Sequence, residues 1–369
     1  MEENNEKKIQ ETAQDDIACI SCGSSLKFKP GSTMLKCDHC GAENPIDIKQ
    51  ENIEEIDFEK FLSENTVGQD KQEIVTVKCK GCGAETTFKP NVVSDFCAFC
   101  GTPMVVKEGT NKSVIKPKSL LPFIYDSDKA FEQFRKWLRK LWFAPSGLKE
   151  FARQAERLQG MYIPYWTYDS KTDSSYTGQR GDDYYVTETY TDNGQSKTRQ
   201  VKKTRWTFVS GRVNNIFDDI LILASKSLPK KKADKLEPWD LKNLVPFDEK
   251  FLAGFKTESY QVELKDGFDQ AKVIMDSEIR VTIKKNIGGD HQRIFSVNTA
   301  YNDITFKHVL LPVWISAYRY KEKVYRFMVN ARTGEVQGER PWSWVKIALA
   351  VVAGLAVIGG IVYLVMQNQ

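Results

Sequence analysis

The sequence lacks the short motifs that mark nucleotide-driven and metal-dependent enzymes. It has no Gly-x-x-x-x-Gly-Lys-Ser/Thr, which excludes a P-loop helicase or ATPase, no Gly-x-Gly-x-x-Gly after a strand and no His-Glu-x-x-His. Histidine is scarce, with only His39, His291 and His308. The acidic doublets Asp182-Asp183 and Asp218-Asp219 could serve general acid–base chemistry, but such doublets are more often solvated turn residues. We therefore expect no enzyme, and an unrecognised hydrolase is a third hypothesis that rests on these doublets alone.

Cysteine is absent outside two clusters near the N-terminus. Each cluster consists of two Cys-x-x-Cys pairs separated by 14 residues, and the second cluster follows the first after 60 residues, position for position. All eight cysteines of the chain belong to these clusters: Cys19, Cys22, Cys37, Cys40, Cys79, Cys82, Cys97 and Cys100. Four thiolates delivered as two pairs are the ligand set of a structural zinc ion. Disulfides and a redox Cys-x-x-Cys site are the alternatives. Disulfides need an oxidising compartment, and the N-terminal stretch has no apolar signal-peptide core. A thioredoxin-like site needs one pair next to a βαβ pattern, not four pairs in a duplicated arrangement.

The clusters predict two tandem four-cysteine zinc ribbons, at residues 17–46 and 77–106, with two structural zinc ions. Each ribbon is too small to bury a useful core, so the metal should supply most of its folding free energy. A closed four-thiolate site leaves no position for water or substrate, and no cysteine remains as a nucleophile. His39 lies between ligands of a complete set, so we predict a surface residue, with a substitute ligand as the alternative. A glycine that can turn the backbone amides towards the sulfurs follows each pair: Gly23, Gly41, Gly83 and Gly101.

Charge is divided unevenly along the chain. Residues 1–118 carry 15 Lys and Arg against 20 Asp and Glu, whereas residues 119–369 carry 38 against 29. Each zinc with four thiolates adds about two negative charges to the first part. Nucleic-acid binding usually requires a basic footprint, so nucleic acid is not the expected partner of the ribbons. We predict disorder for residues 1–16 and an acidic linker for residues 47–76, with a short helix near its middle.

The remaining chain, residues 107–340, predicts an α+β body. Helical periodicity marks Asp128 to Phe143, Gly147 to Gln159 and Phe268 to Asn286. The first of these helices places six large apolar residues on one face, namely Phe131, Phe134, Trp137, Leu138, Leu141 and Trp142. We expect this face to pack in the core. A membrane surface is the alternative, because the opposite face is basic.

Antiparallel β-meanders are predicted between and after the helices. Segments rich in β-branched and aromatic residues lie at 162–168, 184–190, 204–209, 294–300, 309–320 and 323–329, with a turn signal at 192–194. Lys202, Lys203 and Arg205 beside Trp206 could form a nucleic-acid surface, but the wet face of a strand is the commoner explanation. Ile163-Pro-Tyr-Trp166 and Leu311-Pro-Val-Trp314 resemble each other, which suggests that the body contains two related halves.

The C-terminal segment 341–369 predicts a membrane anchor. Ile347 to Met366 is 20 residues without a charge, about 30 Å of helix, which matches the hydrocarbon core of a bilayer. Trp342 and Trp344 precede it, as expected of interfacial aromatics, and Arg340 and Lys346 flank the same side. We therefore predict one transmembrane helix, with the N-terminal bulk in the cytoplasm. The alternative is a buried core helix.

These motifs together resemble a known family. Tandem Cys-x-x-Cys-Gly knuckles, Tyr162-Ile-Pro-Tyr-Trp166, Leu311-Pro-Val-Trp314 and Asn330-Ala-Arg-Thr-Gly-Glu-Val336 before one terminal span are similar to bacterial single-pass zinc-ribbon proteins of phage-shock and envelope-stress systems. Such proteins are also labelled TFIIB-type or primosomal N′, although this sequence lacks the motor motifs of a helicase. The resemblance implies a non-catalytic scaffold that recruits partners such as PspA-like or SPFH-like proteins to the cytoplasmic membrane face. The alternative hypothesis is a membrane-tethered nucleic-acid-binding protein.

Overall fold

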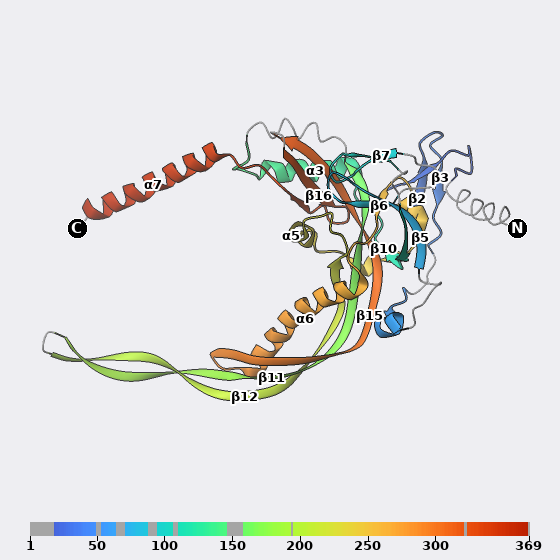
Figure 1. Cartoon of the computed structure of the whole chain (residues 1–369). Coiled ribbons are helices and arrows are strands. Elements are labelled where there is room, and N and C mark those ends of the chain that lie inside the picture. Colours follow the sequence, from blue (N-terminus) through green and yellow to red (C-terminus); the bar gives the residue numbers. More distant parts are fainter. Residues whose placement is uncertain are drawn as a thin grey trace.

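Three very long strands form the frame of the protein in the computed structural model (Figure 1). They are β11 (Gln159–Asp192), β12 (Gln195–Leu223) and β15 (His291–Tyr320). β11 pairs antiparallel with β12 from Tyr165 to its end, and with β15 from Gln159 to Gly181. The structure describes residues 18–48, 53–63, 71–87, 94–105, 110–145, 158–192, 195–320 and 323–367.

Shorter elements complete two further sheets and a helical cover. The shorter strands are β1 (Leu26–Phe28), β2 (Met34–Cys37), β3 (Glu43–Pro45), β4 (Ile56–Asp57), β5 (Lys71–Lys78), β6 (Glu85–Thr87), β7 (Ser94–Phe96), β8 (Pro103–Val105), β9 (Thr110–Ile115), β10 (Ser119–Leu120), β13 (Val245–Pro246), β14 (Lys256–Glu258), β16 (Lys323–Asn330) and β17 (Val336–Gly338). The helices are α2 (Phe58–Ser63), α3 (Ser127–Arg139), α5 (Lys230–Ala233), α6 (Leu264–Ile287) and α7 (Trp344–Gln367), with 3-10 turns at Asp234–Leu236, Leu241–Asn243 and Glu249–Leu252. The large sheet runs in the order β13-β10-β15-β11-β14-β6-β5-β9, with β12, β16, β17 and β4 branching from it. The fold is therefore α+β, with large sheets, as expected.

The expected separate strands at 162–168, 184–190 and 204–209 are parts of only two strands. β11 has 34 residues and β12 has 29, and they end and begin on either side of the predicted turn at 192–194. The glycines inside β11 do not interrupt it. A Cβ at Gly178 would lie 2.3 Å from the carbonyl oxygen of Arg293, so glycine permits close strand approach there rather than a turn.

The two Pro-x-Trp segments are neighbours in the centre of the sheet. Ile163 lies opposite Leu311 in antiparallel register. The indole of Trp166 donates to the carbonyl of Val262, two residues before α6, and that of Trp314 donates to the carbonyl of Tyr125, two residues before α3. Trp166, in β11, thus holds the backbone that leads into α6, which precedes β15. Trp314, in β15, holds the backbone that leads into α3, which precedes β11. The two related halves suggested by these segments stay a prediction.

Helix α3 is shorter than its sequence pattern predicts. The carboxylate of Asp126 accepts from the backbone N–H of Lys129 and caps its start. Phe134 and Leu138 are buried, as predicted, but the helix ends at Arg139 and the chain continues in tight turns to Ala144. Trp142, expected in the apolar face, is 80% exposed as a result. The helix predicted from Gly147 to Gln159 lies almost wholly outside the described residues.

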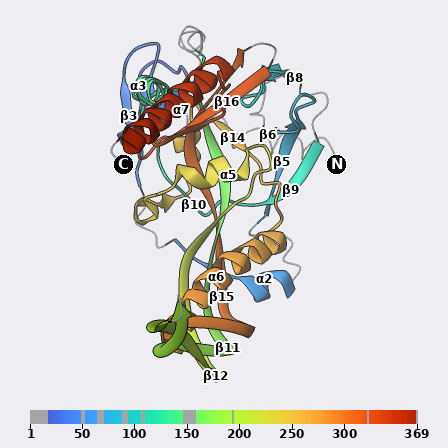
Figure 2. The same cartoon turned by 90° about the vertical axis from the view of Figure 1, so that its left-hand side faces the viewer.

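Helix α6 covers the concave face of the long sheet where three strands remain together (Figures 1 and 2). Phe268, Met275, Ile279 and Ile283 repeat at helical spacing and are buried against Tyr176, Val213 and Phe217 of the strands. The helix ends at Gly288, whose positive φ favours glycine. The expected helix from Phe268 to Asn286 is therefore confirmed.

Candidate metal centres

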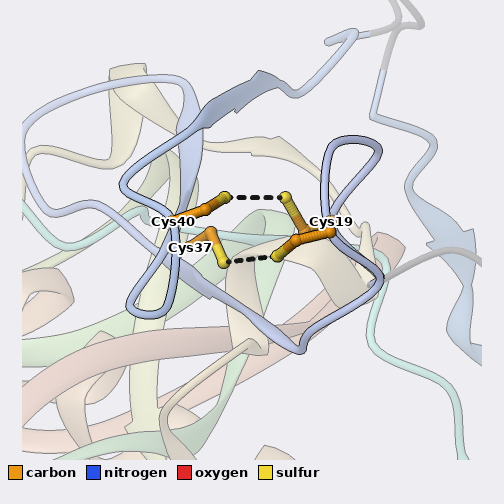
Figure 3. Close-up of side chains that lie close together, drawn as sticks. Cys19, Cys37 and Cys40 are labelled. Atoms are coloured by element: carbon orange, nitrogen blue, oxygen red, sulfur yellow. Dashed lines mark hydrogen bonds between the residues drawn. The ribbon is translucent and has the colours of Figure 1, made fainter.

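The first four cysteines converge on one point (Figure 3). The Sγ atoms of Cys19 and Cys40 are 3.6 Å apart, and those of Cys22 and Cys37 are 3.5 Å apart. A tetrahedral zinc with Zn–S bonds of about 2.3 Å separates its sulfurs by about 3.8 Å. A disulfide would bring two sulfurs to about 2.05 Å, so the spacing fits metal ligands and not disulfides.

The second four cysteines repeat this geometry. Cys79 and Cys100 have sulfurs 3.5 Å apart, and Cys82 and Cys97 have sulfurs 3.6 Å apart. In each cluster all four sulfurs lie within 4.8 Å of one another. The structure therefore brings together all eight predicted ligands as two four-cysteine groups, each able to hold a metal ion.

The backbone around each pair forms the same tight turn four times. Gly23, Gly41, Gly83 and Gly101 have φ between +71° and +76°, and each donates its N–H to the carbonyl of the first cysteine of its pair. This conformation is costly for residues with a Cβ, which explains the glycine after every pair. The backbone N–H of Ser24 also lowers the pKa of the Cys22 thiol to about 6.

Each cluster is packed into the body rather than standing apart from it. In the first, Phe28 contacts Phe251 edge-on, with ring centroids 5.2 Å apart, and lies 6.3 Å from Phe255. In the second, β5 and β6 belong to the large sheet, and the buried Phe99 shares a core with Met161. We expect each ribbon to be too small for a useful core of its own, and in the structure both ribbons share a hydrophobic core with the body.

Thr102 contacts the second cysteine group, and the sequence pattern does not predict this contact. Thr102 Oγ1 lies 3.1 Å from Cys100 Sγ, close enough to donate a hydrogen bond to the thiolate. The same residue's carbonyl accepts from the N–H of Cys97. Such outer contacts fix the orientation of metal ligands. Its only sequence signal is its position two residues after the last cysteine.

The acidic doublets are engaged in ion pairs. Asp169, Asp218 and Asp219 lie close enough to hold a cation, but the Lys307 ammonium lies 2.9 Å from Asp219 and 4.0 Å from Asp169. Lys307 is 6% exposed, so a buried cation already occupies the centre of this group. The other doublet contributes Asp183, which contacts Lys202 at 2.6 Å. Neither doublet forms a pair of free carboxylates.

The basic patch near Trp206 is also largely neutralised. Lys202 pairs with Asp183, and Lys203 pairs with Glu188 at 2.9 Å. The face of Trp206 is covered by the guanidinium of Arg293, 3.8 Å from the ring centroid. The aromatic face that would stack on a base is therefore already occupied.

The three histidines have three different environments. His39 is exposed, as predicted, and lies in the first ribbon beside ligand Cys40. His291 lies 3.0 Å from Asp183, at the start of β15. His308 is buried in the centre of the sheet, with Nδ1 2.8 Å from the carbonyl oxygen of Ile115. Burial lowers the pKa of His308 to about 4.

This buried histidine predicts a loss of stability in mild acid. The folded-state pKa lies below the unfolded value of about 6.5, so the unfolded chain takes up the proton first as the pH falls. Stability is therefore complete above about pH 6.5 and falls towards pH 4, by up to about 3 kcal/mol for His308 alone. The variant His308→Asn should lack this pH-dependent loss of stability when its urea unfolding is compared at about pH 6.5 and about pH 4. Loss of metal in acid affects both proteins alike, so an unchanged pH dependence in the variant would refute the assignment.

Helix α7 has the length and composition of a membrane span. It comprises 24 residues, Trp344–Gln367, and none of its apolar window is buried in the structure. Its side chains from Leu349 to Met366 are exposed wherever the structure describes them, unlike those of a soluble core helix. By length and composition it is able to cross a bilayer. The expected alternative of a buried core helix finds no support in this arrangement.

Comparison with known proteins adds one relative. A protein of Bacillus subtilis (strain 168) named "Uncharacterized protein YdjG" is 28% identical over 350 residues, which cover 92% of this chain and 93% of that protein. No family model matches the chain, and no solved structure matches it. The similarity therefore extends along nearly the whole length of both chains.

Proposed function

We propose that this protein is a non-catalytic membrane-anchored adaptor, held in the cytoplasmic membrane by α7. Its two four-cysteine sites hold structural zinc, because the sulfur spacing and the all-thiolate ligand set suit that ion. Its cytoplasmic part recruits protein partners, with PspA-like or SPFH-like proteins of an envelope-stress response as the candidates. One observation carries the adaptor role, namely the long hairpin of β11 and β12.

The distal part of this hairpin is a two-stranded arm. β15 ends its pairing with β11 at Gly181, so residues 182–192 and 195–205 continue without a third strand among the described residues (Figure 1). Isolated two-stranded ribbons are only marginally stable in water. Cross-strand ion pairs, such as Lys197 with Asp192 at 2.7 Å, support the arm but bury no core.

The arm presents surface suited to another protein. Tyr185 is 65% exposed, and Phe208 and Phe295, whose rings are 6.1 Å apart, are 76% and 56% exposed near its base. Within the described residues no strand pairs with the outer edge of β12. An open edge with exposed aromatics can accept a strand from a partner.

The arm and α7 project from the same side of the body (Figures 1 and 2). Charged side chains exclude the arm from the hydrocarbon core of a bilayer. We therefore propose that α7 turns about the irregular segment 339–343 when it spans the membrane, and that the arm lies over the cytoplasmic face. A partner bound to the arm would then be held close to the membrane.

Shortening the arm tests this function. In the variant, residues 184–203 are replaced by Asn-Gly, which closes a tight hairpin between the paired residues Asp183 and Thr204. We expect the full chain to co-purify with a PspA-like or SPFH-like protein in mild detergent and the variant to lose it. Zinc content and membrane retention should stay unchanged, because neither involves the arm. Recovery of the same partner by both proteins would refute the role of the arm.

The nucleic-acid hypothesis is tested with the same two proteins. Steep salt-dependent retention of DNA or RNA by the full chain, lost in the variant, would favour it over the adaptor. The pairing of Lys202 and Lys203 with carboxylates makes this outcome unexpected.

A further inference from the structure

We propose that a collar of basic and aromatic residues around the start of α7 binds the headgroups of anionic phospholipids. The collar comprises Arg139 at the end of α3, Lys140 and Trp142 from the turns that follow, and Arg340, Trp342, Trp344 and Lys346 from the segment that enters α7. The inference rests on the proposed membrane anchoring by α7. It adds that anionic lipid is preferred and that the chain after α3 also contacts the membrane. The residues after α3 lie about 200 positions before the anchor in the sequence.

Hydrogen bonds join the two parts of the collar. The backbone N–H of Ser343 donates to the carbonyl of Phe143 at 2.8 Å. The ammonium of Lys346 donates to the carbonyl of Ala144 at 2.7 Å and to that of Trp142 at 3.4 Å. Both views place α3 beside the start of α7 (Figures 1 and 2). These contacts lie at the base of α7, and one is made by a long lysine side chain, so they tolerate a change in the direction of the helix.

Three tryptophans of the collar face solvent. Trp142 and Trp344 are each 80% exposed, and Trp342 is 53% exposed. Full exposure of an indole is unfavourable in water, whereas the membrane interface accommodates both its apolar ring and its N–H. Trp142 is exposed because α3 stops at Arg139, which directs this side chain away from the buried Leu138. The exposure of Trp142 thus follows from the end of α3, and it suits a side chain that inserts into the membrane interface.

The charges of the collar select anionic lipid. Arg139 and Lys140 are exposed, Arg340 stacks on Trp342 at 4.1 Å, and Lys346 lies at the first turn of α7. Glu339, which precedes Arg340 in the chain, accepts a hydrogen bond from the backbone N–H of Arg326 through its carboxylate. Basic residues at the membrane surface attract acidic phospholipids, and each contributes up to about a fivefold preference.

The test is photo-crosslinking of the full chain in vesicles. Benzoyl-phenylalanine is introduced at position 142, at position 355 inside α7, and at position 20 in the first ribbon. Ile20 is 86% exposed, and the strands of its ribbon lie on the side of the body opposite α7 (Figure 1). Vesicles contain phosphatidylcholine alone or mixed with phosphatidylglycerol, and metal analysis verifies that position 20 tolerates the change.

We expect lipid adducts at positions 142 and 355 and none at position 20. The adduct at 142 should favour phosphatidylglycerol, and Arg139→Gln with Lys140→Gln should lower that preference by up to about fivefold for each charge removed. Adducts at 355 without an adduct at 142 would overturn the collar while leaving the anchor intact. Equal labelling of both lipids at 142 would overturn the anionic selectivity. Absence of adducts at both 142 and 355 would instead refute the membrane anchoring itself.

Discussion

Replacing Cys79 and Cys82 by serine is expected to lower the metal content from two zinc ions to one and to destabilise the body as well as the second ribbon. β5 and β6, which flank Cys79 and Cys82, are strands of the large sheet. Val77 and Phe99 are buried in the same core as Met161 and Ile163. Zinc in small ribbons contributes about 10–16 kcal/mol of apparent free energy, comparable with the whole stability of a domain.

The measurements are elemental analysis and thermal unfolding of the detergent-solubilised full chain. The matched control is Cys19→Ser with Cys22→Ser, which should also remove one zinc. That ribbon forms a separate three-stranded sheet. It contacts the body through side chains such as Phe28 and through the backbone N–H groups of Phe28 and Gly31, but it does not join the large sheet, so its loss should lower the unfolding midpoint less. The span should still insert in both variants. Two zinc ions retained in the Cys79 and Cys82 variant would contradict the assignment of that site.

Ending the chain after Ser343 is expected to release the protein from the membrane. The truncation removes α7 and its 24 mainly apolar residues, whereas the two cysteine clusters and the sheet remain. Without the span, only the collar residues that remain could hold the protein to lipid, and such contacts are weak and reversible. The protein should therefore move from the carbonate-resistant membrane fraction to the soluble fraction.

Point variants test whether the apolar character of α7 holds the protein in the membrane. Leu355→Arg with Ile358→Arg places two charges at the middle of α7, each of which costs about 2.5–3.5 kcal/mol on insertion. Leu355→Ile is the matched apolar control and should remain in the membrane. A truncated chain that stayed resistant to carbonate would show that α7 is not the anchor.

The two four-cysteine groups could be predicted from the sequence because their requirements are local. A Cys-x-x-Cys-Gly turn places two sulfurs close together whatever the rest of the chain does, and its glycine adopts the positive φ seen at Gly23 and Gly83. The repeated spacing then pairs the turns. Helix α6 was predictable for a similar reason, since a stripe from Phe268 to Ile283 specifies the face that must be buried.

Strand length and the end of α3 could not be predicted in the same way. A two-residue alternation shows that a segment can be a strand but not where it stops, so the sequence pattern predicts only short pieces of β11 and β12. In β11, Gly178 and Gly181 resemble turn signals but meet Arg293 and His291 across the sheet. Trp142 continues the apolar period of α3 although the helix has already ended.

Three features could be inferred from local sequence alone: the two groups of four cysteines, the buried face of α6 and the length of the terminal apolar helix. Each depends on neighbours within a few residues or turns. Three other features depend on long-range packing: Ile163 pairs with Leu311, the second ribbon joins the large sheet, and Trp142 is exposed beside Lys346. Strand register and burial depend on partners more than a hundred residues away, and a local pattern carries no information about which partner will be met.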